Sequence, residues 1–129
     1  MPTPAPRSLA SDIALSIVAP AHNEAENLRP LVAEIHAAIS PLAIAHEIVI
    51  IDDGSTDSTA ELARSFHDPR LRLIHQENSG VAQSRNRGLA ISTTPTVCFL
   101  DADDTIDPAF LATMLPMLAG HDLVPAAYR

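Results

Sequence analysis

The chain has 129 residues, of which 47% are hydrophobic, and a formal net charge of −8 with eight arginines and no lysine. This length suits one domain with an aliphatic core, and the acidic balance without basic runs argues against binding to nucleic acid or to an anionic membrane. The absence of lysine excludes mechanisms that need a catalytic or phosphate-binding lysine. The single cysteine, Cys98, can form no internal disulfide and lies in an apolar run, where we expect a buried and unreactive thiol.

The first twelve residues differ in composition from the rest of the chain. Residues 1–12 are rich in Pro, Ala and Ser, and we expect a disordered N-terminal tail followed by one domain at residues 13–129. The tail lacks the apolar core and the cleavage site of a signal peptide, and no stretch of the chain reaches the roughly 18 apolar residues of a membrane span. We therefore expect a cytoplasmic protein, with a location at the inner face of the membrane as the alternative.

The predicted elements alternate between strands and helices. Apolar β-branched runs predict strands, and apolar residues at helical spacing predict helices. In chain order we expect a strand at 15–19, a helix at 28–39, a strand at 47–51, a helix at 58–66, a strand at 71–75, a helix at 81–91, a strand at 96–100, a helix at 109–118 and a last strand at 124–128. This order predicts an α/β fold with a mostly parallel sheet and helices on both faces.

Two helix starts carry recognisable capping residues. Asn27 is the expected N-cap of the first helix, which places Pro30 in the first turn, where proline is tolerated. Ser58 and Glu61 have the spacing of a capping box at the start of the second helix.

Two acidic clusters follow apolar runs that predict strands buried on both faces. Asp52-Asp53-Gly54-Ser55 follows residues 47–51, and Asp101-Ala102-Asp103-Asp104 follows residues 96–100. Ligands of open parallel sheets bind beyond the carboxyl ends of the strands, so we expect these carboxylates to converge on one rim. Carboxylates so close together repel one another, and Mg²⁺ or Mn²⁺ would relieve that repulsion. The alternative is that these aspartates only cap helices and form turns, positions that favour Asp.

Two further segments belong to the same prediction. The loop at residues 21–24 follows the first strand and so lies on the same rim, where its backbone could hold a flat base; simple N-capping by Asn23 is the alternative. Arg85 and Arg87 lie in the expected helix at 81–91 and suit bidentate contact with phosphate, or else form a solvated helix face. No pair of the other histidines has metal-ligand spacing.

Four segments of the chain resemble the N-terminal half of family 2 glycosyltransferases, the inverting enzymes with a GT-A fold. They are SIVAPAHNE at 16–24, EIVIIDDGSTD at 47–57, QENSGVAQSRNRGL at 76–89 and FLDADD at 99–104. They follow the order and the spacing of the family over about residues 15–118, and together they are specific where each alone is weak.

The resemblance implies a partial, Rossmann-like GT-A domain that binds a UDP- or GDP-linked sugar with Mg²⁺ or Mn²⁺. By position, the residues implied to bind the nucleotide sugar are Pro20, Ala21, His22, Glu24, Asp52, Asp53, Arg85, Asp101, Ala102 and Asp103, and those implied to hold the metal are Asp103 and Asp104. Pro20 to His22 and Asp53 would hold the base, Asp101 and Asp103 would lie near the ribose and the metal, and Arg85 would support the phosphates. The family usually has Tyr at the position of His22, whose ring can still stack or pack.

Members of the family run on for roughly another hundred residues or more. By the resemblance, that part carries the acceptor site and the Asp or Glu that takes the proton of the acceptor hydroxyl. We therefore expect the general base beyond Arg129, assign no catalytic residue within this chain, and expect it to be the donor-binding half. An open sheet edge and uncovered apolar surface would then favour self-association.

Three other functions stay open on the sequence. Residues 101–105 also fit the Asp-x-Asp-x-Thr pattern of haloacid-dehalogenase phosphatases, with Asp101 as nucleophile, but the downstream lysine is absent and the motif is far from the N-terminus. A receiver domain likewise needs a late lysine. The third alternative is a remnant of a transferase that binds nucleotide without turning it over.

Overall fold

The computed structural model describes residues 14–120. The tail expected at residues 1–12 and the strand expected at residues 124–128 lie outside these described residues.

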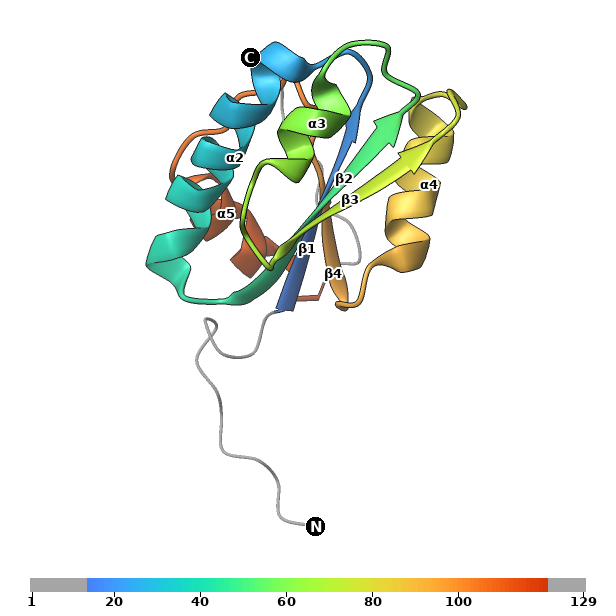
Figure 1. Ribbon diagram of the computed structural model, residues 1–129. Helices are drawn as coiled ribbons and strands as arrows, with labels where there is room; N and C mark the ends of the chain where they lie inside the picture. The colour runs from blue at the N-terminus through green and yellow to red at the C-terminus, as the bar shows by residue number, and fades with distance from the viewer. Residues whose placement is uncertain (1–13, 121–129) are drawn as a thin grey trace.

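Within residues 14–120, four parallel strands form the central sheet, in the order β3-β2-β1-β4 (Figure 1). They are β1 (Ala14–Ala21), β2 (Ala45–Asp53), β3 (Leu71–Gln76) and β4 (Thr96–Phe99). The chain adds β2 and β3 successively on one side of β1 and then returns to place β4 on the other side. The predicted α/β fold with a parallel sheet is confirmed.

The helices cover both faces of the sheet (Figure 1). One face carries α2 (Ala25–Ile39), α3 (Thr59–Arg64) and α5 (Phe110–Met114), with the short 3₁₀ segments η1 (Ser40–Leu42) and η2 (Leu115–Leu118). The other face carries α4 (Val81–Ile91), which packs on β1 and β2. Right-handed crossovers require this arrangement, because the return from β3 to β4 runs opposite to the first two crossovers. Within residues 14–120, no helix combines the length and the apolar character needed to cross a membrane.

The apolar run of β2 is buried on both faces, as predicted. The same prediction for the run in β4 is wrong, because β4 pairs with one strand only among residues 14–120 and Phe99 is 41% exposed. Ile48 and Ile50 of β2 pack with the helices α2, α3 and α5, whereas Val49 and Ile51 belong to the cluster under α4. Successive strand residues point to opposite faces, so a strand covered on both sides needs a continuous apolar run. Cys98 is partly buried, and burial raises the pKa of its thiol to about 11, as expected for an unreactive cysteine.

A polar network at the amino end of the sheet holds β4 in register. Glu47 Oε2 accepts hydrogen bonds from Ser16 Oγ at 2.6 Å and from the backbone N–H and the hydroxyl of Thr93, both at 2.9 Å. Glu47 Oε1 lies 3.0 Å from Arg72 Nη2. Burial raises the pKa of Glu47, but the hydrogen bonds and Arg72 outweigh it and leave the pKa below its ordinary value. Three strands and the segment that enters β4 thus meet at one ionised carboxylate.

Both predicted caps were wrong. The helix α2 begins at Ala25, and Asn27 lies inside it, with its Nδ2 donating to Glu24 Oε2 at 2.6 Å. Ser58 precedes α3 but makes no side-chain cap, and the Thr59 N–H donates to the carboxylate of Asp57 at 2.9 Å.

Several element boundaries also differ from the expected ones, among them that of β1, which extends through Pro20 to Ala21. The strand β2 extends to Asp53, so both aspartates of the first cluster belong to the strand itself. The helix expected at 109–118 divides into α5 and η2, because Pro116 has no N–H with which to continue the α-helical hydrogen bonding.

Gly88 allows α4 to pack closely on the sheet. A Cβ at this buried position would overlap Val18 Cγ1. We expect Gly88→Ala to lower the free energy of unfolding by about 1–3 kcal/mol, because overpacking must push the helix from β1. Urea denaturation measures the change, and Gln83→Ala on the exposed side of the same helix is the control, expected to change stability by less than about 0.5 kcal/mol. A Gly88→Ala protein as stable as the wild type would contradict this packing.

Candidate functional site

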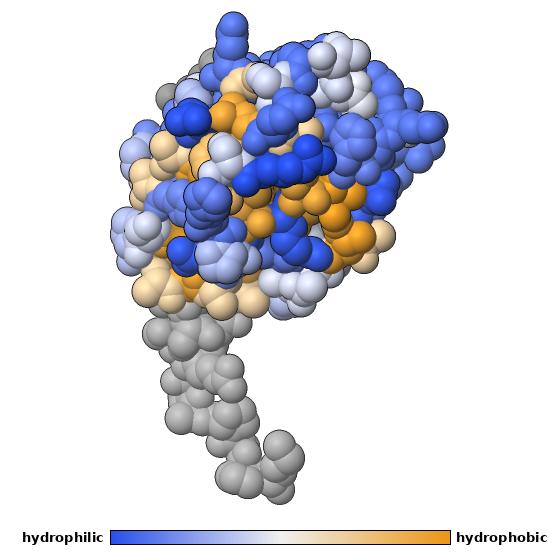
Figure 2. All heavy atoms as spheres, viewed as in Figure 1, coloured by the Kyte–Doolittle hydropathy of each residue, from blue (hydrophilic) through white to orange (hydrophobic). Residues whose placement is uncertain are grey.

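A pocket of about 190 Å³ lies at the carboxyl ends of β1 and β4. These two neighbours mark the point at which the order of strand addition reverses, which is where open α/β sheets bind their ligands. In Figure 2 the surface above the ends of β2 and β3 is largely hydrophilic, and apolar side chains are visible lower down, beside α4. The residues that line the pocket come from the ends of β1 and β2, from the loops after β1 and β4 and from the start of α4: Pro20, Ala21, His22, Glu24, Asp53, Val81, Ser84, Asp101, Ala102 and Asp103.

The residues expected to bind a nucleotide sugar line this pocket, except for Asp52 and Arg85. The two acidic clusters therefore meet at one place, as their positions after two strands of a parallel sheet predict. Val81 and Ser84 also line it and were missed by the sequence analysis. The available signal was Gly80, since a turn residue directly before a helix places the first turn of that helix at the rim.

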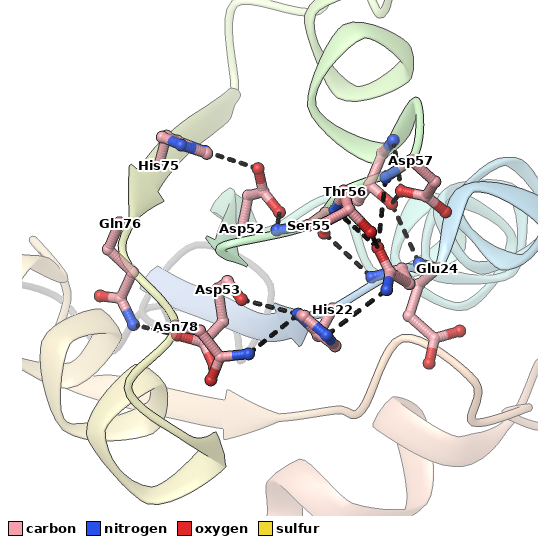
Figure 3. Close-up of polar contacts among 12 residues, drawn as sticks. His22, Glu24, Asp52, Asp53, Ser55, Thr56, Asp57, His75, Gln76 and Asn78 are labelled. Carbon is pink, nitrogen blue, oxygen red and sulfur yellow. Dashed lines mark hydrogen bonds and ion pairs between the residues drawn. The ribbon is translucent and has the colours of Figure 1, made fainter.

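Asp52 does not line the pocket. Its carboxylate is fully buried on the opposite face of the sheet, where it accepts hydrogen bonds from His75 Nδ1 at 2.6 Å and from the Ser55 N–H at 3.2 Å (Figure 3). The two aspartates are consecutive in β2 and so point to opposite faces. Asp52 thus holds β3 and the turn after β2, while Asp53 faces the pocket.

Asp53 joins β2 to the start of α4. Its Oδ1 accepts the Ser79 N–H at 2.7 Å and Gln76 Nε2 at 2.9 Å, and its Oδ2 accepts the Gly80 N–H at 3.0 Å. Burial raises the pKa of Asp53, but these hydrogen bonds outweigh it and leave the pKa below its ordinary value. The carboxylate is therefore ionised at neutral pH and already occupies the N-terminus of α4, a position that otherwise attracts anions.

The loop after β1 is bound to the turn after β2 (Figure 3). Asn23 has a positive φ of 54°; its N–H donates to Ser55 Oγ at 2.9 Å, and its Oδ1 accepts the N–H groups of Thr56 at 2.8 Å and Asp57 at 3.3 Å. The Glu24 N–H donates to Thr59 Oγ1 at 3.0 Å. Asn23 is thus no helix cap but a link between two loops that border the pocket.

His22 is held by the same pair of loops. Its Nδ1 lies 2.7 Å from the backbone carbonyl oxygen of Asp53. A carbonyl can only accept, so Nδ1 carries the hydrogen, and Nε2 of the neutral ring is left as an acceptor. Asn23 Nδ2 lies 3.4 Å from that Nε2. The ring lines the pocket in this fixed orientation.

The acidic group after β4 has the donor set of a divalent-cation site. Asp101, Asp103 and Asp104 each offer a carboxylate oxygen, and these oxygens lie within 4.8 Å of one another; among residues 14–120 this is the one group of its kind. The loop is pinned by the Asp101 N–H, which donates to Asp104 Oδ2 at 2.9 Å. Oxygen ligands at this spacing suit Mg²⁺ and Mn²⁺.

Arg85 lies next to the pocket on α4 but does not line it. Its Nη2 donates to Asp101 Oδ1 at 3.0 Å. Arg87, two residues further on, donates to Gln76 Oε1 at 3.3 Å. Of the two arginines, Arg85 is the one that contacts the acidic group.

The model of glycosyl transferase family 2 matches residues 16–127. This chain belongs to glycosyl transferase family 2. The match over almost the whole chain removes the phosphatase and receiver-domain alternatives.

Three known proteins illustrate the relationship. The uncharacterized glycosyltransferase YibD of Escherichia coli strain K12 is 37% identical over 111 residues, which cover 84% of this chain and 31% of that protein. The mannosyltransferase PcManGT of Pyrobaculum calidifontis, solved with GDP-Man and Mn²⁺, superposes with a TM-score of 0.71 at 26% identity over 81% of this chain and 32% of its own. Glucosyl-3-phosphoglycerate synthase of Mycobacterium tuberculosis was solved with Mn²⁺, UDP-glucose and phosphoglyceric acid. It superposes with a TM-score of 0.63 at 26% identity over 85% of this chain and 41% of its own.

The fold is therefore the GT-A fold, as the resemblance implied. The chain spans about a third of the length of the relative from Escherichia coli and under half of each of the two solved proteins.

The link between the two loops can be tested at Asn23. We expect Asn23→Ala to lower the free energy of unfolding by about 2 kcal/mol, because two backbone N–H groups lose their acceptor and alanine is placed at a positive φ. Asn23→Asp keeps an acceptor oxygen and should lower the free energy of unfolding by less than about 1 kcal/mol. Asn23→Gly removes the acceptor but adopts a positive φ without strain, so its loss of stability should lie between those of the Ala and Asp variants. Urea denaturation gives all three values. Equal stability of the Ala and Asp variants would show that the hydrogen bonds contribute nothing.

Proposed function

We propose that this domain, working in the cytoplasm or at the inner face of the membrane, binds the UDP- or GDP-linked sugar donor of a glycosyl transfer. Binding would take place in the pocket between the ends of β1 and β4, with Mg²⁺ or Mn²⁺ at Asp103 and Asp104. The observation that carries the proposal is the convergence of Asp53, Asp101 and Asp103 on this single pocket.

The base would lie against the loop after β1. Pro20, Ala21 and His22 supply backbone groups and a flat ring, and the ring is held in place by the Asp53 carbonyl. Because both Asp53 oxygens already accept hydrogen bonds, Asp53 would act by shaping this end of the pocket and by accepting at most one further N–H from the base.

The diphosphate would lie toward β4. The Asp53 carboxylate lies beside the N-terminus of α4, bound to the Ser79 and Gly80 N–H groups, so it would repel a second anion there. The phosphates therefore need positive charge from elsewhere. Asp103 and Asp104, with Asp101 beside them, form a donor set that fits a divalent cation, whose charge would neutralise the leaving diphosphate.

Two relatives support this assignment of donor and metal. PcManGT was solved with GDP-Man and Mn²⁺, and the glucosyl-3-phosphoglycerate synthase with UDP-glucose and Mn²⁺. Both match this chain over more than four fifths of its length with TM-scores above 0.6. The proposal extends to the donor alone, because the chain covers under half of each of these proteins.

Calorimetric titration with UDP and GDP, each with and without Mn²⁺, tests the proposal. We expect one nucleotide to bind only with Mn²⁺, and Asp103→Asn to weaken that binding at least about tenfold through the loss of a charged ligand. Glu61→Gln, which removes one exposed carboxylate on α3 at the other face of the sheet, is the control and should bind like the wild type. Absence of binding by both nucleotides in the presence of Mn²⁺ would defeat the proposal.

Self-association through the edge of the sheet is a second, separate proposal. Within residues 14–120, β4 pairs with one strand only, and the side chain of Phe99 at its end is 41% exposed. Unpaired strand edges and exposed apolar side chains favour association. Static light scattering at increasing concentration should show a rising mass, which Phe99→Ser should reduce, whereas a constant monomer mass would count against it.

A further inference from the structure

Arg85 and the acidic group share one carboxylate. Arg85 Nη2 lies 3.0 Å from Asp101 Oδ1, and Asp101 contributes one of the three clustered carboxylates. Arg85 Nε is buried and has no hydrogen-bond partner among the described residues. The guanidinium thus makes one charged contact and leaves another donor unused.

We propose that Arg85 and a divalent cation compete for Asp101, and that cation binding releases Arg85 to hold the diphosphate. The inference rests on the proposed function, because it concerns the cation and the nucleotide assigned to this pocket. Arg85 then has two alternative partners: Asp101 in the metal-free protein and the diphosphate in the complex.

Electrostatics gives the direction of the exchange. A dication held by this acidic group would lie within a few ångströms of the guanidinium, and two positive charges at that range repel each other. The ion pair that must break is weak, because its side chains are 40% and 35% exposed, and exposed pairs contribute little stability. A cation bound at Asp101 would therefore displace Arg85 at small cost.

The released side chain suits the second ligand. A guanidinium presents its donors in a planar fork that matches pairs of phosphate oxygens, and the unused Nε–H is one arm of that fork. Cation and diphosphate would therefore bind cooperatively, because each favours the arrangement in which Arg85 leaves Asp101. By linkage, this coupling acts equally in both directions.

Opposite changes in two affinities distinguish this exchange from a purely structural role. Titration with Mn²⁺ alone, followed by the electron paramagnetic resonance of free Mn²⁺, should show about three- to fivefold tighter binding to Arg85→Gln than to the wild type, because the competing charge is gone. Titration of the Mn²⁺-loaded proteins with the nucleotide that binds the wild type should show at least about tenfold weaker binding to the same variant. Arg87→Gln, which removes an arginine that contacts Gln76 instead, should change neither affinity.

A second variant and a measurement on the wild type separate the exchange from any misfolding of Arg85→Gln. Arg85→Lys keeps the charge without the fork, so it should bind Mn²⁺ like the wild type and the nucleotide more weakly. In the wild type, titration with diamagnetic Mg²⁺ should shift the Nε–H resonance of Arg85 and leave that of Arg87 unchanged.

Each outcome bears on one of the two proposals. Arg85→Gln binding Mn²⁺ with equal or lower affinity, or binding the nucleotide as tightly as the wild type, would overturn the exchange while leaving the pocket assignment intact. A wild type that binds neither nucleotide in the presence of Mn²⁺ would overturn the proposed function itself.

Discussion

The hydrogen bonds of Asp53 hold the site together. The carboxylate binds the N–H groups of Ser79 and Gly80 at the start of α4 and the side chain of Gln76 at the end of β3, while the backbone carbonyl binds His22 in the loop after β1. The end of β2 is thereby joined to three other elements. Because these hydrogen bonds keep the pKa of Asp53 below its ordinary value in spite of burial, the carboxylate stays charged at neutral pH and keeps these bonds.

This arrangement divides the site into two ends of different chemistry. At the β2 end, Asp53 places its own negative charge beside the N-terminus of α4, where it would repel a second anion. At the β4 end, Asp101, Asp103 and Asp104 concentrate negative charge that the described residues offset with Arg85. A ligand with a flat polar ring at one end and phosphates that need a cation at the other fits this division.

Neighbouring residues of one motif have different roles: some line the pocket, and others join loops and strands. His22 and Asp53 border the pocket, whereas their neighbours Asn23 and Asp52 are used to join loops and strands (Figure 3). At the other end of the sheet, the Glu47 network holds the segment that enters β4. The position of the acidic loop after β4 thus depends on a carboxylate at the far end of the same sheet.

The sequence by itself determined the parallel α/β architecture, the order of elements from 14 to 120 and the convergence of the two acidic clusters. It could do so because continuous apolar runs identify strands covered on both faces, and parallel strands bring their carboxyl ends to one edge.

Only the tertiary structure decided which neighbouring residue does which task. Asp52 and Asp53 are alike in sequence, and their separate partners follow from strand register, which places His75 beside one and Gln76 beside the other. The cap at Asn27 failed for a similar reason: α2 begins at Ala25, whose N–H donates to Asp57 Oδ2, a partner that is distant in sequence and close in space. The pairing of Arg85 with Asp101 likewise depends on how closely α4 packs on β1 through Gly88, a distance that no local pattern encodes.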